Sequence, residues 1–445
     1  MFLLSKDREL DIALLKKVLD KFKSSELTKR QIYKNYYDGQ HAILRKTKSD
    51  PSKPCNRIVT NFCKVITDTY TGYIAGKPIT YTSNDNIEDV QEVVNYNDDE
   101  NANIQWLQNA LIHGVGYELQ WIDTDGQVRY SQINPLTCFA IHSASLEKEL
   151  LYFVRWYDVC DFDDSDIKHI EVYDAYKKSV YKSEGAAGEL TLIEEVPHNF
   201  GDVPVSVFYL GEDEESIFAQ AITLNDSYNE LQSSEVDSFQ EWADCYLKLK
   251  GIDADDEDLA KMKEGRTLIL PADADADWLT KNVSDTQIEN MLEGTRKDIF
   301  KVTSAPDMGD ENFMAQSGEA IKYKLVMFEN RSSAIVTNFT KAIQRRLELI
   351  CNILNLKASD AVWRDININF VRNLPVNLTE IINTVNSLKG IVSDATLLSQ
   401  IPFITDVQAE LEAVQKQKKE NMDLYGGGFN FGNTAEEEEE EDDVV

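Results

Sequence analysis

The sequence predicts an α+β fold organised around long helices, and two patterns lead to this prediction. Hydrophobic residues recur at three-four spacing over residues 216–250 and again over 318–354, which is typical of amphipathic helices. Between residues 117 and 210, apolar and polar residues instead alternate with period two, which is typical of strands. The chain has 445 residues, a length that accommodates about three domains.

The N-terminal part is predicted to be mainly helical. Residues 5–50 carry one apolar stripe at helical spacing, and a second helix is expected from residue 56 to a point near Gly72. A short strand is expected at 79–82, after a turn. Another helix is expected over 104–113, since Gly114 follows it directly.

The middle part is predicted to be β-rich. The dipeptide Asp125-Gly126 suits a tight turn, so the alternating stretches on either side, 117–123 and 127–133, are expected to form a hairpin. Further strands are expected at 151–158, 169–176, 179–184 and 204–210.

The long helix expected over 216–250 carries acidic residues opposite its apolar stripe. These acids are Asp226, Glu230, Glu235, Asp237, Glu241 and Asp244. Residues 252–284 are predicted to form a small insert with a strand at 266–270. The acidic run 273–277 lacks the glycine and the glutamate that a calcium loop needs at fixed positions, so we interpret it as a solvated loop.

The remainder is predicted to be helical with one strand. A helix from 285 to 302 is separated by the loop 303–317 from the second long helix, which is basic and ends at Leu354. A strand at 363–373 follows. Three shorter helices are expected at 378–389, 393–400 and 404–424. Eight consecutive acids, 436–443, predict disorder through self-repulsion.

The charge balance excludes one class of function. With 78 acidic and 45 basic residues the net charge is -33, so a protein that grips nucleic acid over a broad basic face is not expected. No apolar run approaches the ~18 residues of a membrane span. The six cysteines are scattered without a CxxC pair, which predicts reduced thiols.

Signatures of enzyme chemistry are missing from the sequence. The five histidines show no metal-binding spacing, and there is no GxSxG motif. The stretch 72–78 has only three residues between its glycines, and Pro78 stands where a phosphate loop needs a hydroxyl. We therefore predict a protein that is not an enzyme and that uses no cofactor and no metal.

The long helices favour assembly from several copies. One subunit cannot bury all of the apolar stripes in a single small core, whereas identical helices standing side by side in a ring can. The acidic stripe of 216–250 would then face a channel. Carboxylates repel phosphate, so a DNA duplex could slide through without being held.

Three sequence blocks stand in a characteristic order. They are YKNYYDGQHAILR (33–45), NRIVTNFCKVITDTYTGYIAGKPITY (56–81) and SAPDMGDENFMAQSGEAIKYKLVMFEN (304–330). Together they resemble the portal proteins of tailed bacteriophages, of the Gram-positive siphophage type in the SPP1-like portal family. The resemblance spans about residues 10–425.

The resemblance implies a portal fold and a dodecameric ring at one capsid vertex. By position it implies a wing (1–215), a stem helix (216–250), a clip (251–284), a second stem helix (285–302), a tunnel loop (303–317), a tunnel helix (318–362), a wing strand (363–376), a short helical crown (377–425) and a disordered acidic tail (426–445).

The resemblance also implies roles for particular residues. The DNA-facing tunnel loop would contain Asp307, Met308, Asp310, Glu311, Asn312, Phe313 and Met314. The acids of 216–250 given above would line the channel. The docking surface of the clip would contain Asp255, Asp256, Glu257, Lys261, Lys263 and Arg266.

The implied partners are those of a capsid vertex. They are further copies of the chain, the terminase large subunit, the head-completion or adaptor protein, the major capsid and scaffold proteins, and the double-stranded DNA that enters and leaves. The expected location is the virion, after assembly in the host cytoplasm, and no membrane is implied. Two other hypotheses remain open, a metal-dependent phosphoesterase or nuclease that uses the acidic clusters, and an acidic scaffold or chaperone.

Overall fold

The computed structural model describes residues 1–48, 50, 53–159, 167–184, 189–242, 246–250, 275–279, 285–309, 325–356, 362–373, 385–399, 401, 404 and 407–425. The chain divides into two units, Met1–Asn373 and Leu374–Val445. Helices and sheets both contribute substantially, so the predicted α+β class is confirmed.

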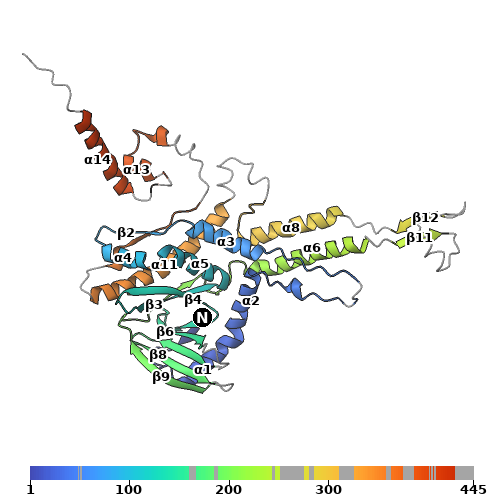
Figure 1. Cartoon of the computed structure of the whole chain (residues 1–445), viewed down its shortest axis with the longest axis horizontal. Coiled ribbons are helices and arrows are strands. Elements are labelled where there is room, and N and C mark those ends of the chain that lie inside the picture. Colours follow the sequence, from blue (N-terminus) through green and yellow to red (C-terminus); the bar gives the residue numbers. More distant parts are fainter. Residues whose placement is uncertain are drawn as a thin grey trace, which may run out of the picture. The chain divides into compact units, whose positions relative to one another are not determined.

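The elements follow in chain order (Figure 1). The helices are α1 (Ile12–Lys21), the π-helix η1 (Phe22–Glu26), α2 (Leu27–Tyr37), η2 (Ala42–Arg45), α3 (Phe62–Ala75), α4 (Glu88–Tyr96), α5 (Asp99–His113), η3 (Ala219–Ala221), α6 (Ile222–Trp242), α8 (Asp285–Thr303), α11 (Val326–Leu356), η4 (Trp363–Asp365), α13 (Asp394–Ser399) and α14 (Val407–Tyr425). The strands are β1 (Phe2–Leu4), β2 (Thr80–Thr82), β3 (Val115–Ile122), β4 (Val128–Ile133), β5 (Cys138–Ser143), β6 (Leu150–Asp158), β7 (Lys168–Tyr173), β8 (Lys177–Glu184), β9 (Glu189–Pro197), β10 (Val205–Tyr209), β11 (Tyr246–Lys250), β12 (Asp275–Leu279) and β13 (Asn367–Asn369).

Two sheets form the β-rich part of the first unit. The larger has the strand order β1-β5-β6-β7-β8-β9, and the smaller has the order β10-β3-β4. They pack against each other through Tyr117 and Leu119 of β3, Phe153 of β6 and Tyr173 of β7. The predicted hairpin is confirmed, since β3 pairs with β4 and Gly126 adopts a φ of 74° in the turn between them.

Helices cover the outer faces of both sheets. On the larger sheet, α1 packs its leucines against Phe139 and Ile141 of β5. On the smaller sheet, the rings of Trp106 from α5 and Phe339 from α11 pack against Phe208 of β10. The β-rich part of the first unit therefore consists of two packed sheets with helices on their outer faces.

Gly114 joins this helical layer to the smaller sheet. It ends α5 with a φ of 79°, a conformation that side chains with a Cβ rarely adopt. A Cβ at this position would stand 2.2 Å from the carbonyl carbon of Glu214. The glycine predicted to end this helix is thus required by both backbone conformation and close packing.

Two predictions around the long acidic helix are wrong. Residues 246–250 are not helical, because α6 ends at Trp242 and β11 follows it. The sequence YLKLK alternates, and in the structure β11 pairs antiparallel with β12. The run 273–277, interpreted as a solvated loop, contributes its last three residues to β12.

Other boundaries also differ from prediction. Helix α3 continues past Gly72 to Ala75, and α5 begins at Asp99, five residues earlier than expected. The alternating stretch 363–373 contains only the short strand β13, which pairs with β2, and it is preceded by the helical turn η4. Strands β1, β5 and β9 were not predicted, because their residues show no clear alternation of apolar and polar side chains.

The remaining predictions divide between confirmed and undescribed segments. Helix α8 confirms the helix expected from residue 285, and α13 and α14 confirm two of the three C-terminal helices. Helix α11 ends within two residues of the predicted Leu354, but its expected start at 318 lies outside the described residues, as do the strand 266–270 and the acidic run 436–443. Cys55, Cys63, Cys138 and Cys351 are free thiols.

Candidate functional site

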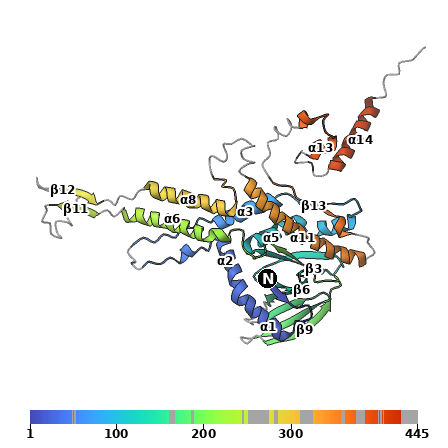
Figure 2. The same cartoon turned by 180° about the vertical axis from the view of Figure 1, so that it is seen from behind.

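The helices α6 and α8 lie side by side, as both views in Figures 1 and 2 show. They are joined to α3 by Phe62, whose ring meets Tyr228 of α6 at 5.0 Å and Phe300 of α8 at 5.7 Å between ring centroids. Both ring pairs have the edge-to-face geometry that aromatic side chains prefer. One phenylalanine at the start of α3 thus holds the two helices together.

One stripe of α6 carries four buried polar side chains at intervals of four residues. We call this set the polar ladder, and it consists of Asn225, Asn229, Ser233 and Asp237. Residues 56–60, which precede α3 and have no regular secondary structure, run alongside this stripe, and we call them the strap. Figures 1 and 2 show the chain between α2 and α3 following α6.

The polar ladder bonds to the backbone of alternate strap residues. Thr60 donates its N–H to Oδ1 of Asn229 (2.9 Å), and its carbonyl accepts from Nδ2 of Asn225 (2.8 Å). Ile58 donates its N–H to Oγ of Ser233 (3.0 Å). Four helical residues rise about 6 Å and two extended residues about 6.6 Å, so successive partners stay opposite each other.

The last rung of the ladder is charged. Oδ1 of Asp237 accepts from the backbone N–H of Asn56 (2.7 Å) and from its amide (2.8 Å). Lys46 and Lys48 stand 3.7 and 3.6 Å from the other oxygen. Burial raises the pKa of Asp237, but the hydrogen bonds from Asn56 and the charges of the two lysines outweigh it and hold the pKa below its usual range.

The structure does not place the predicted channel acids on one free face. Asp226 accepts a hydrogen bond from the hydroxyl of Tyr36 (2.7 Å), and Asp237 belongs to the ladder. Glu230 is more than half exposed and pairs with Lys46 at 3.1 Å. Of the remaining three acids, Glu235 is half-buried, Glu241 lies in the last turn of α6, and Asp244 lies outside the described residues.

A junction connects this helix pair to α11. Arg331 of α11 donates to the carbonyl oxygens of Val302 near the end of α8 and of Ile217 just before η3, both at 3.3 Å. The hydroxyl of Tyr70 in α3 donates to the carbonyl of Thr303 (2.8 Å). Two side chains thus satisfy carbonyls at the helix ends, which would otherwise lack partners.

The first residues of the predicted tunnel loop are anchored to α8. Oδ1 of Asp307 accepts from the guanidinium of Arg296 (2.7 Å) and from the N–H of Gly309 (3.0 Å). Met308 is exposed. The other predicted tunnel-loop residues, Asp310, Glu311, Asn312, Phe313 and Met314, lie outside the described residues, as do the clip residues Asp255, Asp256, Glu257, Lys261, Lys263 and Arg266.

A buried charge network fixes the far half of α11, and sequence analysis missed it. Arg346 is fully buried and donates to both carboxylate oxygens of Glu118 (2.7 and 2.6 Å) and to Asp99 (2.5 Å). Its guanidinium also lies against the rings of Trp106 and Tyr130, 4.9 and 4.5 Å from their centroids. The sequence showed Arg346 only as one of several basic residues of the helix.

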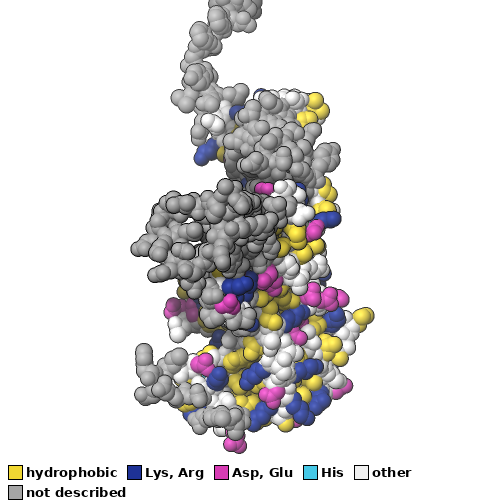
Figure 3. Space-filling model, turned by 90° about the vertical axis from the view of Figure 1, so that its right-hand side faces the viewer, with side chains coloured by type: hydrophobic (Ala, Val, Ile, Leu, Met, Phe, Trp, Pro, Cys, Tyr) yellow, Lys and Arg dark blue, Asp and Glu magenta, His cyan; other side chains and the backbone are white. Residues whose placement is uncertain are grey.

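The described residues offer little for metal chemistry or membrane insertion. Within the described ranges, no three His, Cys, Asp or Glu side chains come together as metal ligands would, and no helix is long and apolar enough to span a bilayer. On the face shown in Figure 3, basic and acidic side chains are interspersed with hydrophobic ones. A broad basic surface is not seen on that face.

The comparison with protein families decides the classification. Residues 16–424 match the model of the family described as phage portal protein, SPP1 Gp6-like. The chain belongs to this family. It is also similar to the portal protein of Bacillus phage SPP1, with 21% identity over 94% of this chain and 88% of the relative. The portal protein of Clostridium phage phiCD119 is 22% identical over 87% of this chain and 92% of the relative.

Proposed function

We propose that copies of this chain assemble into a dodecameric ring whose bore conducts double-stranded DNA into and out of a capsid. The family match over nearly the whole chain carries this proposal. The paired helices α6 and α8 support it, because they expose large apolar side chains, Phe239 and Met291, at 73% and 55%. Such side chains gain from contact with a neighbouring copy.

Ring formation is tested on the purified full-length chain. Light scattering should give a mass near twelve times 50.7 kDa, and negative-stain images should show rings with a central opening. The double variant Phe239→Ser, Met291→Ser should reduce the ring fraction, while Leu146→Ser, which changes a still more exposed apolar side chain in the turn between β5 and β6, should not. A chain that stays monomeric at all concentrations would rule the proposal out.

We propose that the segment following Gly309 faces the DNA in the bore. Asp307 and Gly309 support this division, because they tie the start of the loop to α8 and leave the residues after them as the part that can contact DNA. Deleting Asp310–Met314 should leave rings intact and lower DNA packaging in an in vitro assay. Loss of rings on this deletion would contradict the assignment.

The acids of α6 are proposed to keep DNA off the wall of the bore. Asp226 and Asp237 accept hydrogen bonds within the same chain, so this role falls to the remaining acids, among which Glu230 pairs with Lys46 but is more than half exposed. Replacing Glu230 by Lys should slow DNA passage, since a fixed cation attracts phosphate. The measurement is the packaging rate at low and high salt.

The segment 251–284 is proposed to dock the terminase large subunit and the head-completion protein. The basic residues of this segment, Lys261, Lys263 and Arg266, support this proposal, because they can pair with acidic groups of a partner protein. Reversing these three to Glu should abolish binding of the terminase in a pull-down while ring formation continues. Capsid and scaffold proteins are proposed as partners of the wing, and the virion vertex as the final location after assembly in the host cytoplasm.

We propose that the chain itself has no catalytic activity. The nuclease alternative requires carboxylates gathered around metal ions, and the described residues contain no such group. Incubating purified rings with linear DNA and Mg²⁺ or Mn²⁺ should leave the DNA intact. Cleavage that copurifies with the rings and is lost with chelator would favour the alternative.

A further inference from the structure

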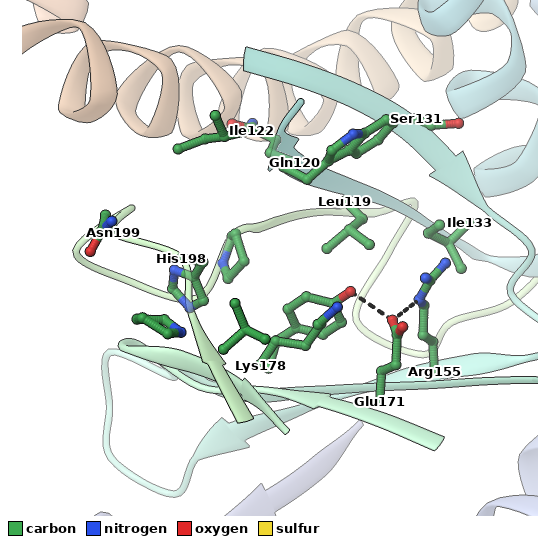
Figure 4. A pocket seen from close by; sticks show the side chains of 15 residues that line it. Leu119, Gln120, Ile122, Ser131, Ile133, Arg155, Glu171, Lys178, His198 and Asn199 are labelled. Carbon is green, nitrogen blue, oxygen red and sulfur yellow. Dashed lines mark hydrogen bonds and ion pairs between the residues drawn. The ribbon is translucent and has the colours of Figure 1, made fainter. Parts of the chain in front are cut away.

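A cavity of about 560 Å³ lies between the two sheets of the first unit. Strands β3 and β4 form its upper wall, β6, β7 and β8 form its floor, and the segment from the end of β9 to Asn199 closes one side (Figure 4). Its volume falls within the range of about 300–1,000 Å³ that is typical of ligand sites. None of the roles discussed above uses this cavity.

The upper wall of the cavity is apolar. Leu119 of β3 and Ile133 of β4 face the floor from above in Figure 4. Three further apolar side chains line the cavity and are more than a third exposed to solvent, Trp121 (39%) and Ile122 (38%) of β3 and Val196 (36%) of β9. Exposed apolar side chains around a concave surface indicate a contact site.

The floor is cationic. The carboxylate of Glu171 accepts from Nε of Arg155 (2.5 Å) and from the hydroxyl of Tyr173 (2.7 Å), so this acid is already engaged. Burial raises the pKa of Glu171, but these bonds outweigh it and keep the pKa below its usual range, so the acid stays ionised. Lys178 also lines the floor, and its positive charge helps to lower the pKa of Glu171, although no hydrogen bond or close ion pair of its ammonium is found among the described residues.

Arg155 and Lys178 together carry one more charge than Glu171 neutralises, so the floor is net positive, although the net charge of the chain is -33. A half-buried ammonium that makes no close ion pair gains from an incoming carboxylate, because the surrounding protein screens charge less than water does. The apolar upper wall requires that this carboxylate be attached to an aliphatic or aromatic group.

The sheet edges beside the cavity favour a peptide. Among the described strands, β4 and β9 each pair with one neighbour. The side chain of Asn97 already bonds to the Val128 carbonyl and the Tyr130 N–H of β4, so β9 offers the freer edge of backbone N–H and C=O groups. Ser131 and Ile133 of β4 and Val196 and Pro197 of β9 line the cavity. An extended segment could therefore bond to an edge strand while its side chains enter the cavity.

We propose that this cavity binds a short segment of a partner protein in which an acidic residue stands next to aliphatic or aromatic residues. The carboxylate meets Lys178 and Arg155, and the apolar side chains meet Leu119, Ile133 and Trp121. The proposal concerns a single subunit and does not depend on ring formation.

The probes are three capped tripeptides whose binding is measured by calorimetry on the purified full-length chain. N-acetyl-Leu-Asp-Leu-amide carries both features, N-acetyl-Leu-Asn-Leu-amide lacks the charge, and N-acetyl-Gly-Asp-Gly-amide lacks the apolar groups. The first should bind at least about tenfold more tightly than either of the others, because the second lacks a charge-assisted contact and the third lacks the apolar groups that become buried. Equal binding of the Asp and Asn peptides would overturn the proposal.

Variants locate the binding. Lys178→Gln should weaken binding of the first peptide by about tenfold, while Lys177→Gln, which removes the neighbouring charge that pairs with Glu195 instead of lining the cavity, should leave it unchanged. Ser131→Trp fills the cavity from an exposed position and should abolish binding with no change of charge. An equal loss in both lysine variants would indicate non-specific attraction and overturn the proposal.

Comparing peptide binding by rings and by dissociated subunits shows whether the cavity binds a different protein or a second copy of the chain. Rings and dissociated subunits should bind the first peptide alike if the cavity is kept open for a different protein. Binding by subunits alone would mean that a neighbouring copy fills the cavity in the ring, which overturns the proposed occupant.

Discussion

Helices α6 and α11 are both held by polar groups, but in opposite ways. In α11 one buried cation, Arg346, meets two buried anions, Glu118 and Asp99, in the middle of an apolar core. In α6 the bonds are mostly neutral, and they are spread along the helix, where successive polar side chains bond to Thr60, Ile58 and Asn56 of the strap.

The difference concerns what happens when one group is removed. Removing one member of a buried ion network destabilises the fold strongly, because the charges left behind are buried without compensation. A ladder of separate side chain to backbone bonds loses one rung at a time, each worth about 1 kcal/mol. We therefore expect α11 to respond to substitution in an all-or-none way and α6 to respond gradually.

The largest effect is expected for Arg346→Met. The substitution leaves Glu118 and Asp99 buried without a cation and should lower the free energy of unfolding by about 3–5 kcal/mol. Urea denaturation of the purified chain measures it. Arg345→Met is the matched control, because Arg345 is partly exposed and water can replace its bonds to Asp202, Glu348 and the Val203 carbonyl, so it should cost about 1 kcal/mol.

The network is expected to be non-additive. Combining Arg346→Met with Glu118→Gln should cost less than the sum of the two single changes, since the second removes a charge that the first has left unpaired. Strict additivity would show that the three charges do not act as a unit, and the contrast with α6 would fail.

An intermediate effect is expected for Asn229→Leu. Asn229 is fully buried and bonds both to Thr60 and, through its amide, to the ring of His41 at 3.2 Å. Its loss leaves the Thr60 N–H without a partner and should cost about 2 kcal/mol. Hydrogen exchange should show faster exchange at Thr60, and a uniform change over the whole chain would argue against a local rung.

A smaller effect is expected for Ser233→Ala. Only the bond from the Ile58 N–H is lost, so the cost should be about 1 kcal/mol. Ser227→Ala is the control, because Ser227 is exposed and bonds only to the carbonyl of Thr223 in its own helix. A cost in the control equal to that of Ser233→Ala would mean that helix propensity and not the strap is responsible.

The smallest effect is expected from the titration of Asp237. Its pKa is lower in the folded chain than in the unfolded chain, so its contribution is present above the unfolded value of about 4 and is lost as the pH falls through the folded value. Urea midpoints measured between pH 6 and pH 3 should fall less steeply in Asp237→Asn than in the unchanged protein. The same slope in both would show that Asp237 does not contribute.

Local patterns predicted the parts of the fold that local physics decides. The Asp125-Gly126 turn and helix α8 follow from turn chemistry and three-four spacing, and both are confirmed. Strand β11 was missed because its alternation follows directly on a helical stripe, and nothing local marks the change at Trp242. Pairing with β12, 25 or more residues further on, decides that segment.

The candidate site depended on contacts that are distant in sequence. The partners of Arg346 lie 228 and 247 residues away, so no local pattern could show that this arginine is buried. The polar ladder left a signal that could have been read. Asparagine and serine at intervals of four on a long helix, beside acids that seemed to form the polar face, indicate a second polar stripe with a partner of its own.

The geometry of the strap limits its own length. Four residues of α6 span about 0.6 Å less than two residues of an extended chain, so the helix and the strap gradually lose register. The mismatch is about 1.2 Å after two steps and about 1.8 Å after three, which is more than the roughly 0.5 Å over which hydrogen-bond lengths vary. A longer series of such bonds could form only if the helix bent or the strap departed from an extended conformation. A few bonds are therefore the maximum for an extended segment that pairs with a straight helix.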